Sequence, residues 1–138
     1  MLRHVLLALV LLAVTGCGGG ADPSSDSALT GPVTLERSGG IAGIQEQLVV
    51  AEDGTATFTS KRLRAREVPV SDPQLDALVT ALRGWDAVPE DQRFDGQIAD
   101  AIASTVTYAG HTVTTETSAE QDPRLAAVLA ALGEIQPD

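Results

Sequence analysis

Few residues of this chain could carry out chemistry. It has one cysteine, Cys17, and two histidines, of which His4 lies in an N-terminal segment that we expect to be removed. Neither a cysteine–histidine pair nor a cluster of cysteine and histidine metal ligands can then be assembled. A serine–histidine–aspartate triad would have to use His111, which lies where we expect a hairpin turn and a solvated side chain. The sequence therefore predicts no metal site, no cofactor and no enzymatic activity.

The charged residues point in the same direction. The 19 acidic and 9 basic residues give a net charge of −10, and no spacing singles out one catalytic pair of carboxylates among so many. No glycine pattern typical of phosphate or dinucleotide binding is present. Such an acidic balance argues against nucleic acid as a partner and against wide contact with anionic lipid headgroups. It favours a basic or protein partner.

A short basic segment differs from this acidic background. Lys61, Arg62, Arg64 and Arg66 place four of the nine basic residues within six positions. The three arginines alternate with other residues, so in a strand they would lie on one face. One interpretation is a solvated strand face that discourages sheet-edge association. The other is a basic docking patch for an acidic partner or an anionic wall polymer.

A glycine-rich segment is the second candidate for binding. It consists of Ser38, Gly39, Gly40, Ile41, Ala42, Gly43 and Ile44. Glycine lets the backbone take positive φ or come close to another surface. The two isoleucines are either core residues that fix this loop or apolar anchors offered to a partner.

The N-terminal sequence indicates a membrane address. An unbroken apolar run, Val5 to Val14, is too short to span a bilayer and suits the core of a signal peptide. With Thr15 and Gly16 before Cys17, it resembles the signal of a bacterial lipoprotein; the alternative is an ordinary secretory signal with a chance cysteine. The resemblance implies removal of residues 1–16 and lipidation of Cys17. We expect a lipid-anchored protein on the extracytoplasmic face of the cell membrane, with residues 17–32 as the lipidated cysteine and a flexible linker.

The remaining residues, 33–138, predict a single α+β domain. Alternating or β-rich stretches predict a strand at 33–37, a hairpin of 48–50 with 55–59, a strand at 63–68 and a hairpin of 102–108 with 111–117. Apolar spacing predicts amphipathic helices over 71–84 and from Asp122 onward, with Trp85 folded onto the core and 86–100 as a long loop. The expected architecture is a mostly antiparallel sheet with both helices on one face.

The pattern resembles a known family. The run from Thr34 to Ile44, followed by an Asp-Gly hairpin, a helix and a late hairpin around Tyr108 to Val113, is similar to the emfourins, small bacterial inhibitors of thermolysin-like metallopeptidases such as protealysin. The resemblance implies a protein without catalysis or a metal of its own, whose partner is an extracellular metallopeptidase. On this hypothesis Ile41 or Ile44 fills an apolar subsite of the cleft. The alternative is an envelope lipoprotein that binds a wall polymer or a protein partner through the basic segment.

Overall fold

The chain folds around one seven-stranded sheet. A computed structural model describes residues 29–93, 100–117 and 119–137. The strands are β1 (Val33–Gly39), β2 (Ile44–Val50), β3 (Ala56–Ser60), β4 (Arg66–Val68), β5 (Asp91–Gln92), β6 (Ile102–Tyr108) and β7 (His111–Glu116), in the spatial order β4-β3-β2-β1-β6-β7-β5. All neighbouring strands are antiparallel except β5 and β7, which are parallel.

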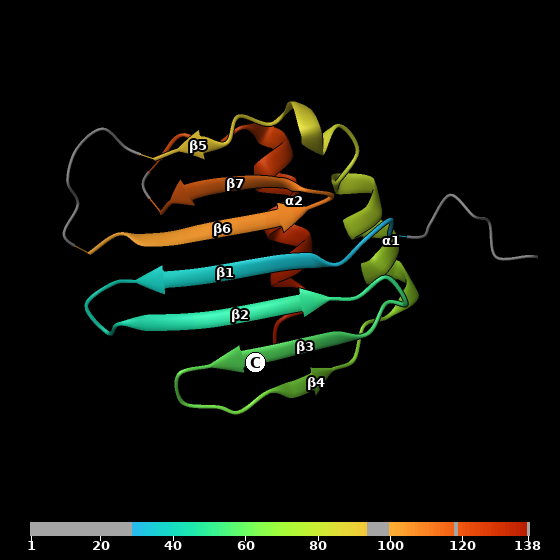
Figure 1. Ribbon diagram of the computed structural model, residues 1–138, viewed down its shortest axis with the longest axis horizontal. Coiled ribbons are helices and arrows are strands. Elements are labelled where there is room, and N and C mark those ends of the chain that lie inside the picture. The colour runs from blue at the N-terminus through green and yellow to red at the C-terminus, as the bar shows by residue number, and fades with distance from the viewer. Residues whose placement is uncertain (1–28, 94–99, 118, 138) are drawn as a thin grey trace, which may run out of the picture.

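Two helices cover one face of this sheet. Helix α1 (Asp72–Ala81) and helix α2 (Pro123–Gly133) both lie behind the sheet in Figure 1. The predicted α+β class, the mostly antiparallel sheet and the two helices are therefore confirmed. Among the described residues, no helix is long and apolar enough to cross a membrane.

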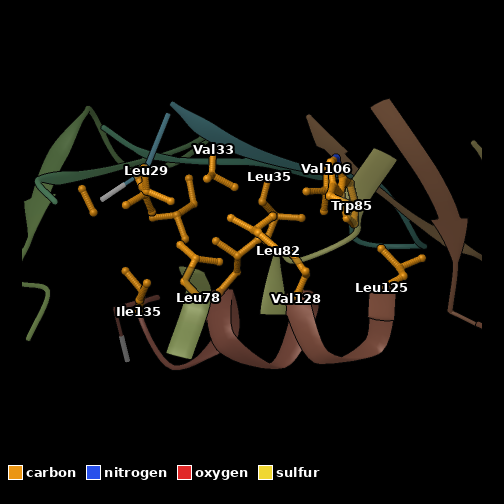
Figure 2. Close-up of a cluster of buried hydrophobic side chains, with 14 of the residues drawn as sticks. Leu29, Val33, Leu35, Leu78, Leu82, Trp85, Val106, Leu125, Val128 and Ile135 are labelled. Atoms are coloured by element: carbon orange, nitrogen blue, oxygen red, sulfur yellow. The ribbon is translucent and has the colours of Figure 1, made fainter. Parts of the chain in front are cut away.

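Strand β1 is central and has partners on both sides. Leu35 lies opposite Leu48 of β2 and Val106 of β6. Because side chains alternate along a strand, these residues face the helices while Thr34 and Glu36 face the other way. Figure 2 shows Val33, Leu35 and Val106 above side chains from the two helices. The buried layer between sheet and helices is the hydrophobic core.

Local signals set the ends of both helices. Ser71 caps α1 in a reciprocal capping box with Gln74, and Asp122 caps α2 by accepting a hydrogen bond from the backbone N–H of Arg124. Side-chain hydrogen bonds from Arg124 also lower the pKa of Asp122, because they stabilise its carboxylate. The expected apolar faces contribute to the core through Leu78, Leu82, Leu125, Val128 and Leu132, all buried.

The segment after α1 is more ordered than the long loop that we expected over residues 86–100. Gly84 takes a left-handed conformation, with φ at 72°, before the short 3-10 helix η2 (Trp85–Ala87). Trp85 is buried, as predicted, and its Nε1–H donates to the carbonyl of His111 at 3.1 Å. The backbone N–H of Thr114 donates to Glu90 at 2.7 Å, which aligns β5 beside β7. Residues 94–99 of the expected loop lie outside the described residues.

Several expected boundaries are wrong. The strand expected over 33–37 extends to Gly39, and the strand expected over 48–50 begins at Ile44, so both ends of the glycine-rich segment lie in strands. The strand predicted over 63–68 is only β4, because Ser60 and Leu63 exchange backbone hydrogen bonds and close a turn there. Packing onto the domain also begins before Val33: Leu29 is buried in the core, and the hydroxyl groups of Thr30 and Tyr108 are 2.8 Å apart. The last residues of the expected 17–32 linker therefore belong to the fold.

Replacing Leu29 tests the early start of the domain. We expect Leu29→Ala to lower the free energy of unfolding by about 2–4 kcal/mol, because it removes buried apolar atoms and leaves a cavity. Leu63→Ala is the matched control, since Leu63 is 51% exposed, and it should change stability by less than about 0.5 kcal/mol. Urea denaturation followed by tryptophan fluorescence measures both. Equal effects of the two variants would show that the core does not need Leu29.

Candidate binding surface at the loop edge of the sheet

The two candidate segments of the sequence meet at one end of the sheet. The β1–β2 loop (residues 40–43) and the β3–β4 loop (residues 61–65) lie together at the left of Figure 1. The backbone N–H of Lys61 donates to the carbonyl of Gln45 at 2.9 Å, which ties the β3–β4 loop to the start of β2, next to the β1–β2 loop. We call the surface formed by these two loops the loop edge.

Hydrogen bonds fix the β1–β2 loop. The N–H of Gly43 donates to the carbonyl of Gly40 at 3.0 Å, which closes the turn. The N–H of Gly40 donates to Ala101 at 3.2 Å, which ties the turn to the residue before β6. The loop is thus held in one shape before any partner arrives.

Gly39 is required by its conformation and its surroundings. Its φ is +109°, and a Cβ placed on it would lie 2.5 Å from the backbone oxygen of Ala101. Backbone atoms cannot move aside as a flexible side chain can. Gly40 and Gly43 also take positive φ, at +70° and +59°. The glycines therefore let the turn form against β6.

The tips of the two loops carry exposed apolar side chains. Ile41 is 88% exposed and Leu63 is 51% exposed, and they are the exposed large hydrophobic residues of the described chain. Ile44 instead begins β2, opposite Gly39, and is half-buried. Of the two isoleucines in the glycine-rich segment, Ile41 is the one placed to contact a partner. No pattern in the sequence indicated the exposure of Leu63, which we expected to begin a strand.

The turn at the start of the β3–β4 loop is also well defined. Its backbone N–H groups at Arg62 and Leu63 both lie within hydrogen-bond distance of the Ser60 hydroxyl, at 3.4 and 3.1 Å. This side-chain bridge replaces backbone partners that a continuing strand would have supplied. The exposed Leu63 therefore lies in a turn that is closed by hydrogen bonds.

The basic residues are arranged differently from the prediction. Arg62 and Arg64 lie in the loop and Arg66 lies in β4, so the three do not share one face of a strand. Together with Lys61 they are exposed, and the ion pairs found among residues 29–93, 100–117 and 119–137 involve other side chains. The result is a positive surface on a chain of net charge −10.

A cavity of about 420 Å³ lies between the loops. It is lined by Ala42, Gly43, Ile44, Gln45, Glu46, Ser60, Lys61 and Arg62. Glu46 has an ion-pair partner in Arg37, at 3.5 Å, which offsets its charge. Gln45, Glu46 and Ser60 were missed as candidates because nothing in the sequence indicates that strand ends 15 residues apart border one cavity.

His111 is less exposed than we predicted. Its Nε2 is 2.8 Å from the carbonyl oxygen of Val88, so this nitrogen carries the proton, and its ring meets Trp85 edge-on at 6.0 Å. The contact secures η2 against β7. In the part of the chain that the structure describes, no three histidine, cysteine or acidic side chains are grouped to hold a metal ion.

Cys17, the signal segment 1–16 and residues 17–28 of the linker lie outside the described residues. Comparison with protein-family models, curated proteins and solved structures gave no match. The similarity to the emfourins stays a prediction.

Replacing Gly39 tests the geometry of the loop edge. We expect Gly39→Ala to lower the free energy of unfolding by about 2–4 kcal/mol, through backbone strain and the contact with Ala101. Gly31→Ala is the control, because a Cβ there has nothing within 4 Å and φ is outside the left-handed region. Thermal unfolding by circular dichroism compares the two. If Gly39→Ala is as stable as the control, the close approach to Ala101 is not a constraint.

Proposed function

We propose that this protein is a lipid-anchored, extracytoplasmic inhibitor that blocks thermolysin-like metallopeptidases by inserting its loop edge into their cleft. The observation that supports this most is the position of Ile41. It lies within the segment that resembles the emfourins, and it is the most exposed large apolar side chain in the described chain, on a turn held by hydrogen bonds.

The geometry of this turn suits inhibition. A peptidase cleft rewards an apolar anchor that is already in its bound shape, because little conformational entropy is then lost on binding. Burying an isoleucine side chain contributes about 1.5–3 kcal/mol. The glycines beside Ile41 carry no side chains, so the partner's backbone can approach closely. Inhibition of this kind needs no catalytic group in the inhibitor.

The anchor is proposed from the sequence. Lipidation of Cys17 would hold the domain at the outer face of the membrane, and the peptidases that it meets would be extracellular. A single acyl chain binds membranes weakly, so the two chains of a diacylated cysteine are needed for stable attachment.

Replacing Cys17 tests the anchor. We expect Cys17→Ala to abolish membrane attachment by lipid and to leave residues 1–16 uncleaved, since both steps require the thiol. Ser24→Ala, seven positions further on, should behave as the unchanged chain. Detergent-phase partition and intact mass after expression in a bacterium with a lipoprotein pathway measure both effects. If the Cys17→Ala protein still showed the mass increase of lipidation, the assignment of Cys17 as the lipidated residue would be contradicted.

Replacing Ile41 tests inhibition. The full chain in mild detergent is assayed against a panel of thermolysin-like metallopeptidases, and slow-onset, tight inhibition of at least one is expected. Ile41→Asp should weaken it at least about 100-fold, because a charge in an apolar subsite is costly. Ala126→Asp adds the same charge on the exposed side of α2 and should change nothing.

If none of the peptidases in the panel is inhibited, the inhibitor function is contradicted. That result would favour the second candidate function, an envelope lipoprotein that binds an anionic wall polymer or a protein partner. The four exposed basic residues support that alternative. Because arginine–polymer binding is electrostatic, it would weaken steeply with ionic strength, whereas binding through an apolar anchor would not.

A further inference from the structure

The cavity of the loop edge combines two chemistries that a partner must match. Two of its lining side chains, Lys61 and Arg62, are cationic, and its one acidic lining residue, Glu46, is paired with Arg37. The cavity therefore has a net positive lining on an acidic protein. Ile41 directly precedes one lining segment, and Leu63 directly follows the other.

The backbones of both cationic residues are held by hydrogen bonds, while their side chains are exposed. Lys61 is fixed through its backbone to Gln45, and its Nζ is 4.0 Å from the position that a Cβ on Gly43 would occupy. The ammonium group thus lies over the glycine turn. Arg62 follows it within the turn that Ser60 closes. A small anionic group entering between the loops would meet both cations.

We propose that this cavity binds a carboxylate side chain from an acidic segment of the partner protein, while Ile41 and Leu63 contact apolar residues on either side of that carboxylate. The proposal rests on the proposed function only in taking the loop edge as the binding surface. It names the chemistry that the partner must present, which is an acidic side chain with apolar side chains two positions before and two positions after it in one extended segment, so that all three face the loop edge.

The apolar tips favour a protein segment over a phosphate polymer. Lys61 and Arg62 would attract a phosphate as well as a carboxylate. A polyol phosphate, however, has no apolar groups to cover Ile41 and Leu63. These two side chains would then remain exposed to solvent in the complex. An acidic protein segment satisfies both the cations and the apolar tips.

A peptide probe tests the proposal. The probe is a short peptide in which one glutamate has a leucine two positions before it and another two positions after it, with threonine at the positions between them. It is titrated into the ¹⁵N-labelled full chain in nonionic detergent. We expect amide shifts at residues 41–46 and 60–63. A peptide with glutamine in place of glutamate should bind at least about tenfold more weakly, and raising the salt from about 0.05 to about 0.5 M should weaken the glutamate peptide several-fold.

Variants locate the site. Lys61→Gln with Arg62→Gln should lower the affinity for the glutamate peptide at least about tenfold. Arg83→Gln is the matched control, because Arg83 is exposed just after α1, outside the loop edge, and it should change nothing. Ile41→Asp with Leu63→Asp should also weaken the peptide, and circular dichroism confirms that each variant is folded.

Three results would overturn the proposal. The first is no shift at millimolar peptide. The second is poly(glycerol phosphate) binding as tightly as the peptide and unaffected by the Ile41 and Leu63 variants. The third is peptidase inhibition that depends on Ile41 but not on Lys61 and Arg62. A flat peptidase panel with peptide binding intact would instead remove the inhibitor function alone.

Discussion

The fold depends on the antiparallel pairing of β1 with strands from both halves of the chain. On one side β1 pairs with β2, which continues into β3 and β4; on the other it pairs with β6, which continues into β7. Each half presents a hairpin and a helix, and neither could bury its apolar face alone. Because Leu35 lies between Leu48 and Val106, this one strand makes the core continuous.

The same strand explains why the loop edge is rigid. Gly39 ends β1 at the place where it meets the start of β6, and the close approach to Ala101 leaves no room for a side chain. The turn that follows is tied to the residue before β6 by the hydrogen bond from Gly40 to Ala101, and it is closed by the hydrogen bond from Gly43 to Gly40. Gly39, Gly40 and Gly43 take positive φ and carry no side chains. Ile41 is therefore the large apolar side chain that projects from this turn.

Local signals in the sequence predicted most of the elements. The β-rich stretches on either side of Ala109-Gly110 indicated a tight turn, which these two residues form with φ of 49° and 80°. Ser71 and Asp122 cap the starts of the two helices. Long-range contacts were not predictable. Strand β5 exists because backbone groups of β7 offer it partners, and Leu29 is buried although its flanking residues are typical of a linker. The two binding segments could be named from sequence, but their meeting depends on β3 lying beside β2, which no single segment encodes.

The direction of β1 sets the orientation of the molecule. Thr30, whose hydroxyl is 2.8 Å from that of Tyr108, comes shortly before β1 at one end of this strand. The loop edge lies at the other end, at the left of Figure 1. The seven residues of β1, at about 3.4 Å each, put roughly 24 Å between its two ends. A chain tethered through its N-terminal segment is therefore held at the end opposite to the loop edge. If Cys17 carries lipid, as we propose, the tether joins the domain at the end of β1 away from those loops, so attachment to the bilayer leaves them accessible to a partner.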